Sequence, residues 1–126
     1  MCANTFISHL KIVFIEAGDD YLKAELQLGP HLMQPMGIMH GGVSCGLAET
    51  VASVAANYCV DAKTHYCVGI DINTNHIRPA KAGVLTATAR PYHLGKKTQV
   101  WSIEIVDDQN NLISISRLTV MTLEKT

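Results

Sequence analysis

The residue in this chain that is best placed to do chemistry is Glu49. It is the only charged residue between Gly41 and Val60, in a stretch made of small and apolar side chains. A carboxylate in such surroundings is costly unless it is paired or used. The alternative is an ordinary solvated acid on an exposed helix face. The absence of neighbouring charges favours a functional site.

The triplet His40-Gly41-Gly42 stands eight residues or so before that acid and suits a tight turn into a helix. The first N–H groups of a helix have no internal partner and lie at the positive end of its dipole, so they can bind an oxyanion or a polarised carbonyl oxygen. Glycine lets a ligand approach that backbone closely, although a glycine pair can also serve the turn alone. Together, a donor at Gly41 could hold a carbonyl oxygen while Glu49 attacks or deprotonates water.

The spacing of these two groups predicts an assembly. Glu49 follows Gly41 by eight residues, and a helical rise of ~1.5 Å per residue separates the two by roughly 12 Å along the axis. One carbonyl group cannot contact both. We therefore expect a twofold dimer in which Glu49 faces the Gly41 turn of a second, antiparallel copy of the helix.

The elements that must position these groups follow from the periodicity of apolar residues. A spacing of three or four predicts one buried helix face, formed by Val43, Leu47, Val51, Val54 and Tyr58. Strands are predicted at 11–17, 21–28, 65–77, 84–92, 98–106 and 112–123. Within 65–77, alternation places Val68, Ile70, Ile72 and Thr74 on one face. The order β-β-α-β-β-β-β belongs to the α+β class, with a mostly antiparallel sheet wrapped around one central helix.

Composition bounds the remaining possibilities. A chain of 126 residues fits a single domain, 1–126, with a real core. Only 17% of the residues are charged and 48% are hydrophobic, which is easier to understand if part of the surface is buried in an oligomer. The formal net charge of -1 argues against a nucleic-acid partner.

The cysteines and histidines show no metal or disulfide pattern. Cysteines 2, 45, 59 and 67 form no C-x-x-C pair, which indicates reduced thiols in a cytoplasmic protein. The six histidines lack the H-x-x-x-H or H-x-H spacing of a local metal site, so no metal is expected. The start lacks a signal peptide pattern, and Glu49 in the apolar helix argues against a membrane span.

Several motifs resemble a known family. The segment 34–42 (QPMGIMHGG) followed by 47–50 (LAET) resembles the hotdog-fold acyl-CoA thioesterases that act on hydroxybenzoyl-CoA and phenylacetyl-CoA. The segments 68–78 (VGIDINTNHIR) and 92–101 (YHLGKKTQVW) are similar to the branch that acts on 1,4-dihydroxy-2-naphthoyl-CoA in menaquinone synthesis. The resemblance implies the hotdog fold and hydrolysis of an aromatic or medium-chain acyl-CoA. It also implies a homodimer that pairs into a homotetramer.

The resemblance also implies a role for individual residues. Glu49 matches the catalytic acid, acting as nucleophile or general base, and Gly41 matches the backbone N–H that polarises the thioester carbonyl. Gln34 and His40 match side chains that line and orient the reacting group. Ser53 matches the polar residue one turn past the acid. The implied CoA-binding positions are Gly69, His76, Ile77, Arg78, Pro79, His93, Leu94, Gly95, Lys96, Lys97 and Thr98.

The cations among these positions fit the role physically. Arg78, Lys96 and Lys97 stand at strand ends and suit the phosphates of a nucleotide. The lysines could equally be solvated surface charges, whereas for Arg78 the phosphate role is favoured. No cofactor is implied, because CoA is part of the substrate.

Three alternatives to a thioesterase that uses Glu49 have weaker support. A hotdog hydratase or dehydratase would pair a catalytic histidine with an acid, as His40 and Glu49 could, but the residues around them favour a thioesterase. A non-catalytic acyl-CoA-binding module is the second alternative; such regulators typically add a DNA-binding segment, for which this chain is expected to have no room. The third, a Cys45 nucleophile, lacks an acidic orienting group nearby.

Overall fold

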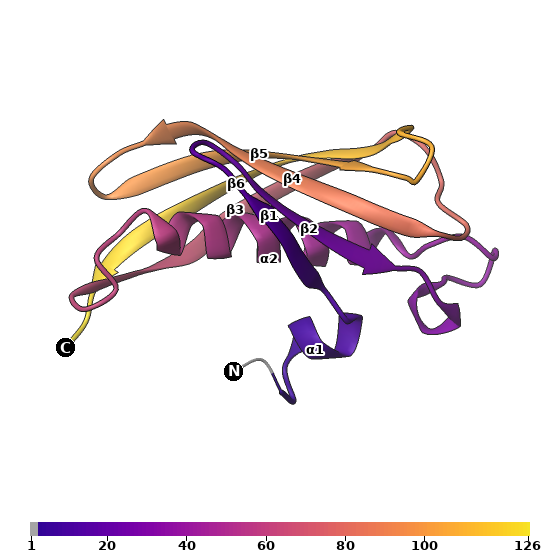
Figure 1. The fold of residues 1–126 in the computed structure, drawn as a ribbon, viewed down its shortest axis with the longest axis horizontal. Coiled ribbons are helices and arrows are strands. Elements are labelled where there is room, and N and C mark those ends of the chain that lie inside the picture. The colour runs from indigo at the N-terminus through magenta and orange to yellow at the C-terminus, as the bar shows by residue number, and fades with distance from the viewer. Residues whose placement is uncertain (1–2) are drawn as a thin grey trace.

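The computed structural model describes residues 3–126 as one six-stranded antiparallel sheet that curves around a long helix (Figure 1). The strand order is β1-β2-β4-β5-β6-β3, so β1 and β3 form the two edges. The elements are α1 (Phe6–Leu10), β1 (Val13–Ala17), β2 (Leu22–Gln27), the 3-10 helix η1 (Pro30–Leu32), α2 (Gly41–Tyr58), β3 (His65–His76), β4 (Val84–Leu94), β5 (Thr98–Val106) and β6 (Leu112–Glu124). The predicted α+β order is confirmed, and α1 lies beneath α2, on the side away from the sheet.

Small side chains set the contact between α2 and the sheet. Ala48 and Ala52 are fully buried, together with Leu47 and Val51 beside them. Because alanine side chains are small, the sheet can lie close to the helix at these positions. The buried face of α2 is therefore the side that carries the alanines. Tyr58 lies at the margin of that face and is 74% exposed, so the prediction that it is buried is wrong.

A β-bulge in β3 reverses the predicted alternation of its side chains. β3 pairs with β6, and the register shifts between Gly69 and Asp71. Before the bulge Cys67 is buried and Val68 is exposed, whereas after it Ile72 packs against the core. The extra residue moves the inward face by one position. The prediction that Val68 and Ile72 share a face is therefore wrong.

Polar contacts fix the C-terminal half of α2 against the sheet. Trp101 Nε1 donates to Gln99 Oε1 at 2.7 Å, and Gln99 Nε2 donates to the backbone oxygen of Ala56 at 3.4 Å. Asn57 forms a clamp to β3, where its Oδ1 accepts from the Cys67 N–H at 2.9 Å and its Nδ2 donates to the Cys67 oxygen at 3.3 Å. These bonds hold the C-terminal half of α2, and the side chains that it carries, in a fixed position relative to β3.

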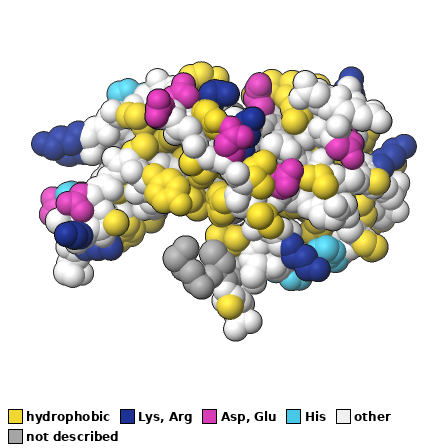
Figure 2. Space-filling view, viewed as in Figure 1, with side chains coloured by type: hydrophobic (Ala, Val, Ile, Leu, Met, Phe, Trp, Pro, Cys, Tyr) yellow, Lys and Arg dark blue, Asp and Glu magenta, His cyan; other side chains and the backbone are white. Residues whose placement is uncertain are grey.

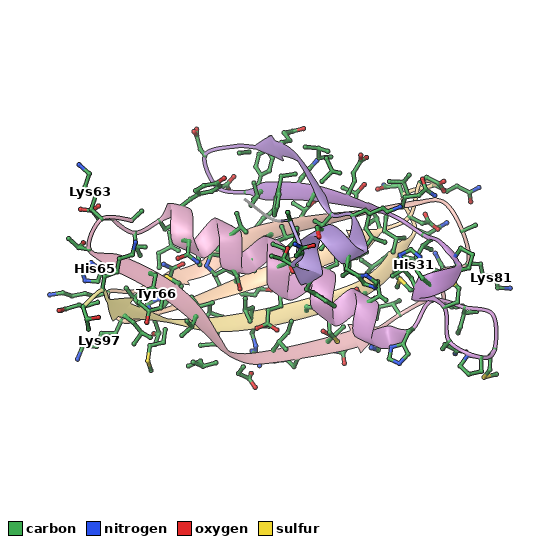
Figure 3. All side chains as sticks on the ribbon, turned by 90° about the horizontal axis from the view of Figure 1, so that it is seen from below. His31, Lys63, His65, Tyr66, Lys81 and Lys97 are labelled. Carbon is green, nitrogen blue, oxygen red and sulfur yellow. The ribbon has the colours of Figure 1, made fainter. Side chains whose placement is uncertain are left out.

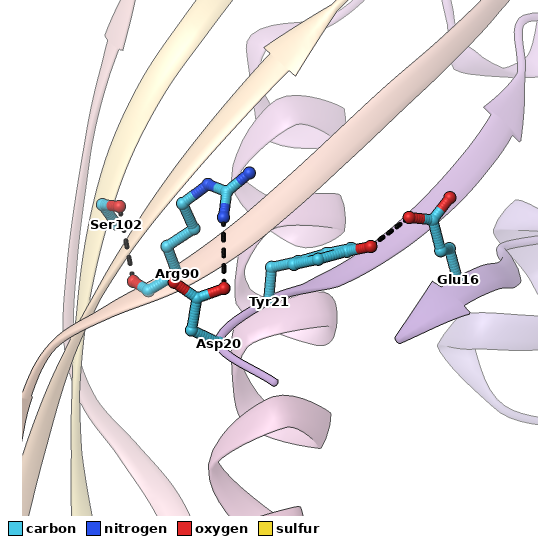
Figure 4. Close-up of polar contacts among 5 residues, drawn as sticks. All are labelled: Glu16, Asp20, Tyr21, Arg90 and Ser102. Carbon is cyan, nitrogen blue, oxygen red and sulfur yellow. Dashed lines mark hydrogen bonds and ion pairs between the residues drawn. The ribbon is translucent and has the colours of Figure 1, made fainter. Parts of the chain in front are cut away.

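A small polar cluster closes the β1–β2 hairpin (Figure 4). The Tyr21 hydroxyl donates to the Glu16 carboxylate, and the Arg90 guanidinium lies 5.1 Å from the centre of the Tyr21 ring. Arg90 and Asp20 form, at 3.5 Å, the one ion pair among the described residues. The bond to Glu16 raises the pKa of Tyr21, because ionisation would lose the bond and set two negative charges side by side.

The surface mixes apolar and charged regions. Figure 2 shows hydrophobic side chains across the middle of one face and lysine or arginine side chains projecting at both ends. No helix within residues 3–126 is both long enough and apolar enough to cross a bilayer. Cys45, Cys59 and Cys67 are free thiols, and Cys2 lies outside the described residues.

Candidate active site

α2 presents Glu49 toward the edge strand β3. The side chain is partly buried, and its Oε2 would lie 2.5 Å from a Cβ atom placed on Gly69. In the described part of the chain Glu49 makes no hydrogen bond and no ion pair. Ser53, one turn later, is also partly buried. The carboxylate oxygens therefore remain available to attack a carbonyl carbon or to accept a proton from water.

A pocket of about 420 Å³ lies beside the N-terminal end of α2. Gly41 is the first residue of the helix, and its N–H has no hydrogen-bond partner among the described residues. The structure brings six of the predicted site residues together around this pocket: Gln34, Gly41, His76, Ile77, Arg78 and Pro79. An unpartnered amide at a helix start suits a polarised carbonyl oxygen.

Three polar groups converge on this pocket. Gln34 uses its Oε1 to accept from the Met36 N–H, and its Nε2 makes no hydrogen bond within residues 3–126, so it can donate to a ligand. The His76 ring packs on Gly41, where an added Cβ would lie 3.1 Å from it. Ser44 is fully buried, and its Oγ has no partner in the part of the chain that the structure describes. Ser44 was not predicted from the sequence, although its position three residues after Gly41 places both on one helix face.

His40 lies against the same helix end but faces another pocket. Its Nδ1 accepts from the Gly42 N–H at 2.8 Å, so the side chain caps α2. The imidazole lines a pocket of about 370 Å³ together with His9 and His31. The Gly41 pocket does not include His40. The structure thus does not bring this imidazole together with the groups around the Gly41 amide.

The predicted CoA-binding positions fall at opposite ends of the molecule. The stretch 76–79 borders the Gly41 pocket. By contrast, Lys97 accepts through its backbone oxygen from the Thr122 N–H at 2.8 Å, and Thr122 pairs with Cys67 near the end of α2. Figure 3 shows Lys97 and His31 at opposite ends of the helix. The 18 residues of α2 span roughly 27 Å at ~1.5 Å each, so one chain does not bring the two groups of positions together.

The β4–β5 turn and the strand ends beside it carry positions 93–98, while Gly69 lies in β3 against Glu49. The Gly95 N–H donates to the Thr98 oxygen at 2.9 Å, and a Cβ on Gly95 would lie 2.7 Å from that oxygen, so the turn requires glycine. The lysines at 96 and 97 are exposed on it. His93 lies on the outer face of the sheet, and Leu94 lines a groove beside Tyr58.

The profile of the Thioesterase superfamily matches residues 36–114. This chain belongs to that superfamily. It is 40% identical to the 1,4-dihydroxy-2-naphthoyl-CoA hydrolase of Escherichia coli, over 98% of this chain and 90% of that protein. A Haemophilus influenzae thioesterase structure aligns with a TM-score of 0.94 and 42% identity, over 98% of this chain and 85% of that one. A mutant thioesterase from Pseudomonas aeruginosa aligns with a TM-score of 0.95 and 38% identity, over 97% and 88%.

Membership confirms two predictions made from the motifs: the thioesterase has the hotdog fold, and it is a thioester hydrolase. Two of its thiols, those of Cys59 and Cys67, differ from an activated nucleophile. Burial raises the pKa of the Cys59 thiol, and Cys67 is buried, with its Sγ 3.7 Å from the Ala56 oxygen. Between residues 3 and 126, no three histidine, cysteine or acidic side chains group closely enough to hold a metal ion.

Proposed function

We propose that this thioesterase hydrolyses an acyl-CoA to a free acid and CoA. Glu49 acts as nucleophile or general base, and the N–H of Gly41 of the partner subunit polarises the thioester carbonyl. The observation that carries the proposal is the presence, on one helix, of a half-buried carboxylate without an ion pair and an amide without a hydrogen-bond partner among the described residues. Their separation along the helix requires two copies of the chain.

Two routes use these groups. In the first, Glu49 takes a proton from water, the hydroxyl oxygen adds to the carbonyl carbon, and the carbon–sulfur bond breaks to release CoA thiolate. In the second, a Glu49 oxygen adds to the carbonyl carbon, thiolate leaves, and water hydrolyses the resulting anhydride. In both routes the carbonyl oxygen gains negative charge, which an amide N–H at a helix start stabilises.

The edge strand β3 supports the assembly that this chemistry needs. β3 is 12 residues long, and its edge exposes apolar side chains such as Val68 and Ile70. A long apolar edge is suited to pairing with another chain. Antiparallel pairing of two β3 strands would set the two α2 helices side by side in opposite directions. It would also bring the Arg78 end of one chain toward the Lys97 end of the other, which gathers cations for the phosphates of CoA.

The substrate class is an aromatic or medium-chain acyl group. The wall of the Gly41 pocket includes Ile38, Met39 and Ile113, which suit an apolar group. The name of the Escherichia coli relative, a 1,4-dihydroxy-2-naphthoyl-CoA hydrolase, supports a bicyclic aromatic acid. A role in menaquinone synthesis, a cytoplasmic location and a homotetramer stay predictions.

Release of free thiol from 1,4-dihydroxy-2-naphthoyl-CoA and benzoyl-CoA tests the proposal. We expect Glu49→Ala to lower kcat by about 10²- to 10⁴-fold, the usual contribution of a positioned base. Glu104→Ala, which removes an exposed acid on β5, is the matched control and should match the wild type. Comparable thiol release by Glu49→Ala would refute the role of the acid. Binding of the ester without release would identify a binding module instead. Label from ¹⁸O-water found in Glu49 after a single turnover would favour the anhydride route.

Mixing two inactive variants tests whether the site is shared between subunits. Gly41→Pro removes the N–H at the first helical position, where proline is tolerated, and the extended backbone of His40 suits a following proline. Gly41→Ala keeps the N–H and is the control. After Gly41→Pro and Glu49→Ala chains are mixed and reassembled, about a quarter of the wild-type sites should be intact if two subunits share each site. No recovery would show that Gly41 and Glu49 do not act together across a subunit boundary.

A further inference from the structure

The backbone and side chain of His40 are held by three hydrogen bonds. Its N–H donates to the Leu32 oxygen at 2.9 Å, and its own oxygen accepts from the Val43 N–H at 3.0 Å. The side-chain Nδ1 accepts from the Gly42 N–H at 2.8 Å. The bond from the Gly42 N–H to the His40 side chain therefore closes a loop of atoms that includes the backbone of Gly41.

The two glycines after His40 each make room for an imidazole ring. A Cβ on Gly42 would lie 3.0 Å from His40 Nδ1, and a Cβ on Gly41 would lie 3.1 Å from the His76 ring. The rings lie against different sides of the helix start, because His76 lines the Gly41 pocket and His40 lines the pocket that contains Gly42. The imidazole of His40 thus meets Gly42, while the Gly41 N–H has no bond within the described residues.

We propose that His40 is a positioning residue that acts as the N-cap of α2 and aims the Gly41 amide, without touching the substrate. The inference rests on the proposed function, since it explains how the polarising amide is held. Nδ1 accepts a hydrogen bond, so the neutral ring carries its proton on Nε2. The cap satisfies the Gly42 N–H, which leaves the Gly41 N–H as the free donor at the start of the helix.

The test compares side chains that can cap a helix with one that cannot. Asparagine and serine are good N-cap residues and alanine is not, but neither asparagine nor serine reaches as far as an imidazole. We expect His40→Ala to lower kcat for thiol release from benzoyl-CoA by about tenfold with little change in KM, as loss of a typical cap would. His40→Asn and His40→Ser should stay within about threefold of the wild type. His31→Ala removes another imidazole of the same pocket and should leave kcat unchanged.

Two outcomes would overturn the inference. One is that His40→Asn and His40→Ser are as slow as His40→Ala, because the imidazole itself would then be needed at the substrate. The other is that His40→Ala retains full kcat. If His40→Ala does not fold, the kcat of His40→Asn decides: a value within about threefold of the wild type supports the cap, and a larger loss refutes it.

Hydrogen exchange of the Gly42 amide separates this inference from the proposed function. The amide should be protected in the wild type and in His40→Asn, and it should exchange faster in His40→Ala, whatever reaction the protein catalyses. A Gly42 amide that exchanges equally fast in all three would refute the cap. By contrast, unchanged activity of Glu49→Ala would refute the proposed function and leave the cap intact.

Discussion

Adding one methyl group at Gly69 should disable the Glu49 carboxylate without unfolding the protein. The Cβ of Gly69→Ala would lie 2.5 Å from Glu49 Oε2, whereas an ordinary contact between carbon and oxygen is about 3.3–3.6 Å. The carboxylate would have to move by about 1 Å, and a displacement of that size can lower a rate on the order of 10²-fold. The next nearest atom, Leu118 Cδ1, is 3.4 Å away, which is an ordinary contact.

The backbone tolerates the change, because Gly69 does not have a positive φ. Alanine within a strand is also favoured over glycine by roughly 0.5–1 kcal/mol. We therefore expect the melting temperature to hold or rise slightly while kcat for thiol release falls about a hundredfold. Val13→Ala shortens an exposed apolar side chain on β1, at the opposite edge of the sheet, and serves as the control. If Gly69→Ala keeps kcat within about threefold of the wild type, the contact between Gly69 and Glu49 does not place the reacting group.

Two further changes test the contacts that hold the fold. The raised pKa of Tyr21 means that its neutral form stabilises the fold below pH 10.0, the ordinary pKa, and that this stability is lost as pH rises through the folded pKa. Tyr21→Phe should therefore flatten the alkaline fall of the melting temperature and remove absorbance that appears above pH 10.0 in an ultraviolet tyrosine titration. Loss of absorbance that appears at or below pH 10.0 would contradict the bond to Glu16. Asn57→Ala should lower the free energy of unfolding in urea by about 1–3 kcal/mol, because it leaves the Cys67 N–H without its partner. A loss below about 0.5 kcal/mol would show that the clamp contributes little.

The sequence predicted the elements well because alternation and helical spacing act locally. Every strand was predicted within two residues of its observed bounds. The bulge in β3 was not predicted, since it depends on pairing with β6 and on the room that Glu49 needs over Gly69. The predicted buried face of α2 included Tyr58, because the prediction followed the large apolar side chains. In the structure the sheet packs against the small side chains of Ala48 and Ala52, so the buried face is centred nearer to them.

The candidate site was predictable in its chemistry and less so in its geometry. The residues around Gly41 were predicted from the motif at 34–42 and from the end of the strand that precedes Arg78. In the structure they line one pocket. The direction of the His40 ring depends on a side-chain torsion and on which amide needs a cap, and residue spacing carries neither. The distance between the Arg78 and Lys97 ends follows only from the tertiary arrangement of β3, β6 and the turn after β4.

The hydrogen bond from Trp101 to Gln99 makes Trp101 an intrinsic fluorescence probe of α2. Trp101 is the only tryptophan of the chain and is 3% exposed, so tryptophan emission comes from one buried indole. Through Gln99 this indole is linked to the backbone of Ala56, in the last turns of α2. Emission should therefore respond, without an added dye, when a second subunit or a ligand disturbs that end of the helix.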